Sequence, residues 1–191
     1  MSAPSGAMKI KVCLVGDAAV GKSSLIGRFV FDQFSDEYQA TMGTKILSKD
    51  VTAKAPSGKD VQVKMMIWDI IGESSLLEDL GQGYFLGAQG IVAVCDLTRF
   101  STYERLPVWL AAVLRTSGSV PMALAVNKTD LRKEVMILYD EYQVQQFADS
   151  IGAKWYMTSA KTGENVEGMF TELANEILLN LRPRALAPTL A

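Results

Sequence analysis

The stretch Gly16-Asp-Ala-Ala-Val-Gly-Lys-Ser23 decides the fold of this chain. It fits G-x-x-x-x-G-K-[ST], a phosphate-binding loop in which glycines let backbone N–H groups converge on an anion. An apolar run at 9–15 precedes the loop, and a segment with helical spacing at 24–31 follows it. A strand, loop and helix in this order set the positive end of a helix dipole against bound phosphates. A chance glycine-rich turn would not carry both flanks, so the sequence predicts a nucleotide-binding site.

The residues of this loop have separate predicted roles. Lys22 is predicted to bridge the outer phosphates, and the Ser23 hydroxyl is predicted to take a Mg²⁺ position. The other predicted cofactor-binding positions of the loop are Asp17, Ala18, Ala19, Val20, Gly21 and Ser24.

Composition excludes several classes of protein. The 191 residues suit one domain with a substantial core, and 49% of them are hydrophobic while 21% are charged. A net charge of −2 without a long basic run gives no support for a nucleic-acid partner. Histidine is absent, which excludes His-based triads and His metal sites. Cys13 and Cys95 lie in apolar runs, so we interpret them as core residues in a reducing compartment.

The two ends of the chain are predicted to be short tails around a domain at 8–181. Residues 1–7 are small and polar without a signal-peptide pattern, and Ser2 excludes N-myristoylation. Residues 182–191 contain no cysteine for prenylation and too few basic residues for stable membrane attachment. The longest apolar runs are too short to span a bilayer. We therefore expect a cytoplasmic protein without a lipid anchor, and a monomer.

Alternating strand and helix patterns predict an α/β protein. Apolar or alternating runs predict further strands at 45–54, 60–68, 90–96, 120–126 and 154–157. Helical spacing predicts helices at 102–116, 139–151 and 165–181, and residues 70–90 are expected to form a loop with one irregular helix. The expected architecture is a P-loop NTPase fold, a six-stranded, mostly parallel sheet with one antiparallel edge hairpin strand and helices on both faces. Ligands bind such sheets at the carboxyl ends of the strands.

One candidate site residue ends the third predicted strand. Asp69 follows an apolar run, where a P-loop protein needs an acidic residue to hold Mg²⁺ through water. Alone, Asp69 would be interpreted as a strand-end cap or turn residue, but the preceding P-loop favours the metal role. Gly72 would let its N–H approach the terminal phosphate.

A guanine-binding motif ends the fifth predicted strand, in Asn127-Lys-Thr-Asp130. The Asp130 carboxylate can accept hydrogen bonds from N1–H and the 2-amino group of guanine, which adenine does not offer. Asn127 is expected to brace the loop, and the stem of Lys128 to pack over sugar and base. In isolation these are common turn residues, so the position at a strand end carries the prediction.

A second base-binding loop follows the last predicted strand. In Thr158-Ser-Ala-Lys161, the Ala160 N–H is positioned to donate to guanine O6, with Lys161 stacking alongside and Ser159 in the same loop. By itself this tetrapeptide would be an ordinary Ser/Thr-rich turn.

These motifs together, over residues 8–181, resemble a small GTPase of the Ras superfamily. Trp68-Asp69 and the segment 83–90 are most similar to the Rab branch, although Gly43-Thr-Lys-Ile46 lacks the usual acidic-aromatic end. A Rab-like core without a lipid site is also similar to the Ras-like GTPases of prokaryotes. The resemblance implies GTP/GDP and Mg²⁺ as cofactors. It also implies effector, exchange-factor and activating proteins as partners through switch regions at about 34–46 and 69–84.

The segment 34–41 matches the first switch of that family. The resemblance implies that Phe34 presses edge-on against guanine and that Tyr38 closes over the phosphates. It implies that Thr41 places its hydroxyl on Mg²⁺ and its N–H on the γ-phosphate. The catalytic residues implied are then Lys22, Thr41, Gly72 and Glu73.

Two departures from the family pattern bear on hydrolysis. Glu73 occupies the place of the glutamine that positions the attacking water, and an ionised carboxylate only accepts hydrogen bonds and adds negative charge beside the γ-phosphate. This predicts slow intrinsic hydrolysis, with Glu73 acting as a base or turned away as alternatives. Ala18 and Ala19 replace glycines found in some relatives, which would hinder an arginine supplied by a partner. The first switch contains no arginine, so we expect none to act in cis.

Two rival functions remain at this point. A pseudo-GTPase that holds GTP permanently as a scaffold is favoured by Glu73. A metabolic P-loop kinase would need an acceptor site and an arginine-rich lid, and the motif at 127–130 argues against it.

Overall fold

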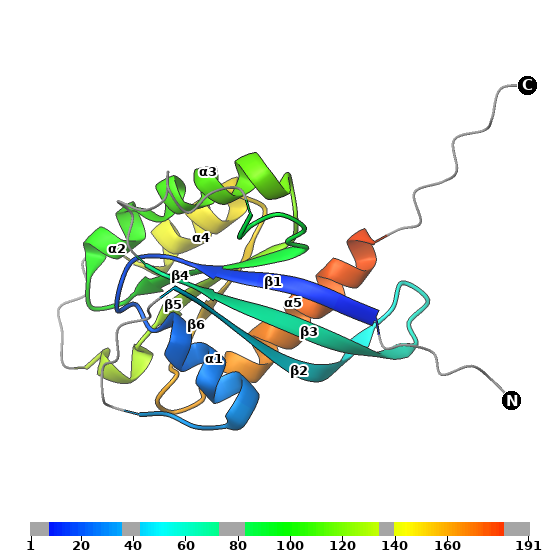
Figure 1. The fold of residues 1–191 in the computed structure, drawn as a ribbon. Coiled ribbons are helices and arrows are strands. Elements are labelled where there is room, and N and C mark those ends of the chain that lie inside the picture. Colours follow the sequence, from blue (N-terminus) through cyan, green and yellow to red (C-terminus); the bar gives the residue numbers. More distant parts are fainter. Residues whose placement is uncertain (1–7, 36–42, 73–82, 134–139, 182–191) are drawn as a thin grey trace, which may run out of the picture.

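A computed structural model describes residues 8–35, 43–72, 83–133 and 140–181. Among these residues, six strands form one sheet in the order β2-β3-β1-β4-β5-β6. The strands are β1 (Met8–Val15), β2 (Thr44–Lys54), β3 (Asp60–Ile70), β4 (Gly90–Asp96), β5 (Met122–Asn127) and β6 (Lys154–Met157). Strand β2 pairs antiparallel with β3, and the other neighbours pair parallel. The predicted mostly parallel sheet with an antiparallel edge hairpin is confirmed (Figure 1).

Helices cover both faces of the sheet, as predicted. The helices are α1 (Lys22–Phe31), α2 (Phe100–Glu104), α3 (Leu106–Ser117), α4 (Glu141–Ser150) and α5 (Val166–Asn180), with a 3-10 turn η2 at Thr129–Leu131. Figure 1 shows α1 and α5 on one face and α2, α3 and α4 on the other. Within the part of the chain that the structure describes, no helix is both long and apolar enough to cross a membrane.

Strand β1 divides its side chains between two hydrophobic cores. Val12 and Leu14 face the core under α1 and α5, whereas Cys13 and Val15 face the core under α3 and α4. Successive side chains of a strand point to opposite faces, so a strand buried on both sides is apolar at every position. Both cysteines are buried thiols, as predicted, and burial raises the pKa of Cys13 to about 11.

Two sequence predictions need correction, and proline explains both. The single helix predicted at 102–116 is two helices, because Pro107 has no N–H to donate to the carbonyl of Tyr103 and a continuous helix would need that bond. Strand β5 begins at Met122 rather than at 120, since Pro121 cannot donate to a strand ladder.

Several predicted segments fall outside the described residues. These are the tails at 1–7 and 182–191, residues 36–42 of the first switch region, and residues 73–82, where the irregular helix was expected. The structure does describe the carboxyl edge of the sheet, with the described residues that directly follow β1, β3, β4, β5 and β6 (Figure 1).

Candidate nucleotide-binding site

The loop between β1 and α1 has a backbone that its glycines permit. Gly16 has φ 138° and a Cβ there would lie 2.1 Å from the carbonyl oxygen of Val94. Gly21 has φ 98° and a Cβ there would lie 2.3 Å from Nδ2 of Asn127. Side chains are therefore excluded at both positions. Ala19 adopts φ 60° in the same loop, a left-handed conformation that costs an alanine about 1 kcal/mol.

Lys22 begins α1 and turns its ammonium back onto the loop. Its Nζ donates to the carbonyl oxygens of Gly16 at 2.7 Å and Asp17 at 2.8 Å. Burial lowers the pKa of Lys22 to about 8, although the carboxylates of Asp69 and Asp17 act in the opposite direction. A desolvated positive charge therefore lies inside the loop, where an anion would stabilise it.

Asp69 is the penultimate residue of β3 and lies beside Ser23. The Ser23 hydroxyl donates to Oδ2 of Asp69 at 2.5 Å, while Oδ1 is buried and has no hydrogen-bond partner among the described residues. Burial raises the pKa of Asp69, and the Ser23 hydrogen bond together with nearby Lys22 and Lys45 opposes the rise. A buried carboxylate oxygen without a partner beside a serine hydroxyl suits a hard cation such as Mg²⁺, which takes oxygen ligands and keeps several waters.

Gly72 brings the segment after β3 against the phosphate-binding loop. A Cβ at Gly72 would lie 2.6 Å from the Ala18 nitrogen and equally close to the backbone carbonyl of Asp17. Only glycine permits this approach of two backbones. The other residues predicted around the terminal phosphate, Tyr38, Thr41 and Glu73, lie outside the described residues.

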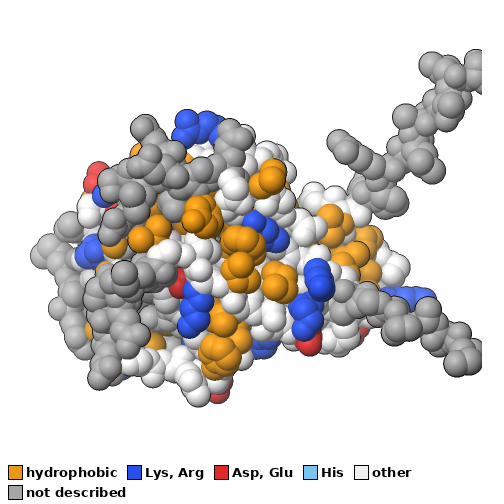
Figure 2. All heavy atoms as spheres, in the orientation of Figure 1, with side chains coloured by type: hydrophobic (Ala, Val, Ile, Leu, Met, Phe, Trp, Pro, Cys, Tyr) orange, Lys and Arg blue, Asp and Glu red, His pale blue; other side chains and the backbone are white. Residues whose placement is uncertain are grey.

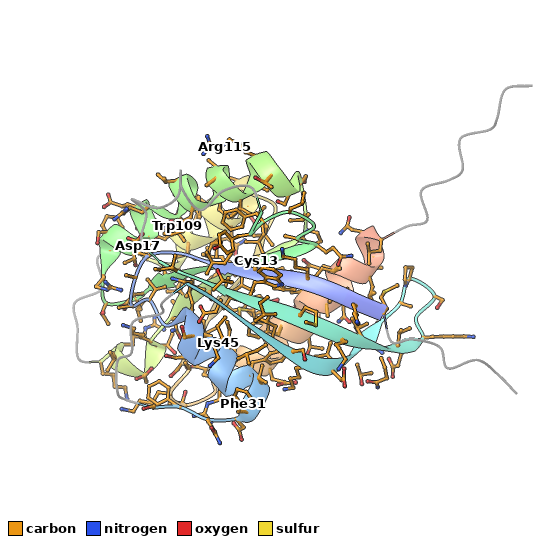
Figure 3. The ribbon with its side chains drawn as sticks, viewed as in Figure 1. Cys13, Asp17, Phe31, Lys45, Trp109 and Arg115 are labelled. Atoms are coloured by element: carbon orange, nitrogen blue, oxygen red, sulfur yellow. The ribbon has the colours of Figure 1, made fainter. Side chains whose placement is uncertain are left out.

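The side chain of Asp17 faces α3. Trp109 of α3 donates its indole N–H to Oδ1 of Asp17 at 2.7 Å, and Nη1 of Arg105 lies 3.4 Å from Oδ2 (Figure 3). The backbone carbonyl of Asp17 thus binds Lys22 in the loop, while its carboxylate binds Trp109 and Arg105 at α3. The role of Trp109 was missed from the sequence, because an aromatic residue at helical spacing is indistinguishable from an ordinary core residue.

Asn127 joins three loops on the other side of the site. Its Nδ2 donates to the carbonyl oxygen of Val20 at 2.9 Å, and its Oδ1 accepts from Thr158 Oγ1 and from the Ala160 N–H, each at 3.3 Å. Asn127 is 1% exposed. One buried amide therefore links the phosphate-binding loop to the loop after β6.

Asp130 lies in η2 and contacts the same loop. The Ser159 hydroxyl donates to Oδ1 of Asp130 at 2.6 Å, and the Thr129 N–H donates to the carbonyl oxygen of Thr158 at 3.1 Å. The predicted guanine-reading groups, Asp130 and the Ala160 N–H, thus belong to one hydrogen-bonded unit. We call Asn127, Asp130, Ser159 and Ala160 the base side, and Ala18, Lys22, Ser23, Asp69 and Gly72 the phosphate side.

Asp96 connects Lys128, which lies between Asn127 and Asp130 of the base side, to the phosphate side, and it was also missed from the sequence. Its Oδ2 lies 2.7 Å from Nζ of Lys128 and accepts from Nε of Arg99 at 2.9 Å, while Nη2 of Arg99 donates to the Ala18 carbonyl at 2.9 Å. Burial alone would raise the pKa of Asp96, but the hydrogen bonds from Lys128 and Thr98 outweigh it and the pKa is lowered. Its signal was available, since Asp96 ends an apolar strand just as Asp69 does.

The remaining predicted residues lie at the rim of the site. Ser24 is half-buried in the first turn of α1, and Phe34 is half-buried and packs against the core under α1 and α5. Lys161 is exposed, and its carbonyl oxygen accepts a hydrogen bond from Arg28.

Comparison with known proteins agrees with this geometry. The sequence profile of the Ras family matches residues 11–179. This chain belongs to the Ras family. It is 34% identical over 181 residues to the GTP-binding protein ypt5 of Schizosaccharomyces pombe, an alignment that covers 93% of this chain and 83% of the relative.

Two other relatives also lie in the Rab branch of the Ras family. The Ras-related protein Rab-5A of Dictyostelium discoideum is 35% identical over 170 residues, covering 88% of this chain and 81% of the relative. The Ypt/Rab-type GTPase YPT7 of Saccharomyces cerevisiae is 33% identical over 175 residues, with the same coverage of 88% and 81%. The predicted resemblance to Rab proteins is confirmed.

Proposed function

We propose that this Ras-family protein is a molecular switch that binds GTP and GDP and hydrolyses GTP to GDP and phosphate. The observation that carries the proposal is the buried Asn127 amide, which holds a phosphate-binding loop and a base-reading loop at one edge of the sheet. The names of its relatives, which include a GTP-binding protein and a GTPase, support it.

Guanine selectivity is assigned to the base side. The Asp130 carboxylate can accept two hydrogen bonds from guanine, and the Ala160 N–H can donate to the base oxygen. Adenine would offer no donor to the carboxylate and would set its amino group against the Ala160 N–H. Sites built on such hydrogen bonds reject the wrong ligand strongly, because buried polar groups are left without partners.

The phosphates are assigned to the phosphate side. Lys22 would exchange the carbonyl oxygens of Gly16 and Asp17 for phosphate oxygens, which are better partners for an ammonium. Ser23 and Thr41 would hold Mg²⁺, with Asp69 acting through water. When bound, Mg²⁺ supplies positive charge that neutralises the β- and γ-phosphate oxygens. We assign to the Gly72 N–H a hydrogen bond to the terminal phosphate, which would couple the segment that follows Gly72 to the presence of that phosphate.

Protein partners would recognise the conformation that this segment adopts when the terminal phosphate is bound. We propose that GTP orders the switch regions at about 34–46 and 69–84 and that loss of the γ-phosphate releases them. Ile46 and Leu86, at the margins of these regions, are exposed at 45% and 68% of their surface. Figure 2 shows hydrophobic side chains interspersed with Lys and Arg across the face that carries β1, β2 and β3. Such a surface suits effector, exchange-factor and activating proteins.

Hydrolysis is proposed to be slow because Glu73 replaces the usual glutamine. The same residue favours one alternative, a scaffold that retains GTP without turnover. Single-turnover GTP hydrolysis with Mg²⁺ separates them, with the native chain compared with Glu73→Gln. Slow native turnover that glutamine accelerates supports the slow switch. Equal and appreciable rates contradict the handicap assigned to Glu73, and retention of GTP without hydrolysis in both supports the scaffold.

A further inference from the structure

We propose that Arg28 of α1 is a positioning residue for the guanine base. In this assignment its guanidinium clamps the loop that carries Ala160 to the end of the helix from which the first switch departs. The inference rests on the proposed function, because it names the residue that holds the base-reading loop in place.

The guanidinium of Arg28 binds two successive carbonyls of that loop. Its Nε donates to the Ala160 oxygen at 2.9 Å and its Nη2 donates to the Lys161 oxygen at 2.8 Å. The Arg28 side chain is 19% exposed and its bond to the Ala160 oxygen is partly buried, so water competes less for that bond than for the exposed one to Lys161. A planar fork that holds two neighbouring carbonyls fixes the orientation of both peptide groups.

These peptide groups belong to the base side. Ala160 is 3% exposed, and its N–H approaches Asn127 Oδ1 at 3.3 Å, while the preceding Ser159 bonds Asp130 at 2.6 Å. A rotation of the loop would therefore move the donor assigned to guanine O6 and would disturb the carboxylate assigned to the other edge of the base. The hydrogen bonds of Arg28 to the Ala160 and Lys161 carbonyls oppose that rotation.

The same guanidinium also contacts the end of α1. Its Nη1 donates to Oδ1 of Asp32 at 2.8 Å and to the Asp32 carbonyl oxygen at 3.1 Å. Asp32 caps the helix with φ 53°, and Phe34 follows two residues later. The Asp32 side chain is 90% exposed, so this ion pair is weaker than the carbonyl contacts. The arrangement links the base loop to the start of the first switch region.

The test measures GDP and ADP affinity and GDP dissociation in Arg28→Met of the full chain. We expect GDP dissociation to be about tenfold faster, and the preference for GDP over ADP to fall by a similar factor, because one displaced hydrogen bond changes affinity about that much. ADP affinity should be unchanged, since the phosphate side is intact. A merely structural role would weaken both nucleotides equally.

Lys49→Met is the matched control. Lys49 also binds a carbonyl of α1, that of Phe29 at 2.7 Å, and pairs with Glu167 at 2.6 Å, but it does not contact the base loop among the described residues. It should lower the melting temperature without changing the nucleotide preference. Arg28→Lys keeps the charge without the fork and should behave like Arg28→Met.

Several results would overturn the clamp. These are native GDP dissociation in Arg28→Met, equal loss of GDP and ADP, or full rescue by Arg28→Lys. If the native chain itself shows no preference for GDP over ADP, the proposed function fails, and the clamp fails with it. If the native preference is present and survives in Arg28→Met, the clamp alone fails.

Discussion

The base side and the phosphate side of this site differ in how their polar groups are paired. On the base side, Asn127, Asp130, Ser159 and Ala160 are hydrogen-bonded to one another or to the backbone. On the phosphate side, Asp69 keeps one buried oxygen without a partner among the described residues, and Lys22 has a pKa lowered to about 8 by burial.

The difference shows that the hydrogen bonds of the base side come from the protein itself, whereas the phosphate side has polar groups that suit a bound ligand. Each residue of the base side has a hydrogen-bond partner among the described residues, which suits constant recognition of one base. The phosphate side holds a desolvated lysine and an incompletely bonded carboxylate, whose electrostatic cost phosphate and Mg²⁺ would offset. A switch needs this asymmetry, because the part that senses the γ-phosphate has to change when the phosphate leaves.

The largest expected effect is on the base side, in Asn127→Ala. The substitution leaves the Val20 carbonyl, the Thr158 hydroxyl and the Ala160 N–H without their shared partner. At about 1–3 kcal/mol for each buried unpaired group, GDP should dissociate roughly 100-fold faster or more. Stopped-flow release of a fluorescent GDP analogue measures this. The exposed Asn180→Ala is the control, and similar rates in both variants would contradict a preassembled base side.

Asp96→Asn tests the link between the two sides and should cost about 2–3 kcal/mol of stability at neutral pH, because Lys128 and Arg99 lose a buried anion. The pKa of Asp96 is lowered in the folded protein, so its contribution is present above the unfolded value of about 4. It is lost as the pH falls through the folded pKa.

Thermal unfolding of the native chain and of Asp96→Asn between pH 7 and pH 3 tests this sign. The difference in melting temperature should shrink toward acid. The exposed Asp60→Asn is the control and should change little at any pH. A difference that stays constant or grows in acid would count against an ionised Asp96 at the centre of the link.

Asp69→Asn on the phosphate side should separate ligand binding from stability. Removing Mg²⁺ with EDTA should accelerate GDP release in both proteins. The acceleration should be about tenfold smaller in this variant than in the native chain, because a loss of ~1.4 kcal/mol of coupling between Mg²⁺ and GDP corresponds to a factor of ten. The nucleotide-free protein should be as stable as native or more so, because burial raises the pKa of this carboxyl. Asp50→Asn, a surface ion-pair residue, is the control. A marked loss of stability in Asp69→Asn would mean that the carboxylate is satisfied after all.

The smallest effect is expected at Ala19, whose φ of 60° favours glycine. Ala19→Gly should stabilise the protein by up to about 1 kcal/mol, a rise of roughly 2–4 °C in melting temperature. Ala18→Gly in the same loop has no left-handed conformation to relieve and should give no gain. Equal changes in the two variants would show that Ala19 is not strained.

The sequence predicted the fold and the site's location because both follow from the spacing of apolar residues and from which residues come at the strand ends. Alternating strands and helices set the parallel sheet, and Asp69 and Asn127 end strands whose carboxyl ends meet at one edge. The contacts that the sequence did not predict are those that side chains make with residues far away in the sequence. Trp109 bonds Asp17, 92 positions away, and Arg28 bonds Ala160, 132 positions away. Neither pair leaves a periodic signal, since Trp109 and Arg28 are ordinary residues of their own helices and Asp17 and Ala160 lie in loops.

The most direct test is competition between GDP and ADP for the full chain, with Mg²⁺ and again after its removal by EDTA. We expect a strong preference for GDP that keeps the same ratio in EDTA, while both absolute affinities fall. That result would mean that the base side reads guanine independently of the phosphate side. Equal binding of GDP and ADP would contradict the proposed function, and a preference that disappears with Mg²⁺ would contradict the preassembled base side.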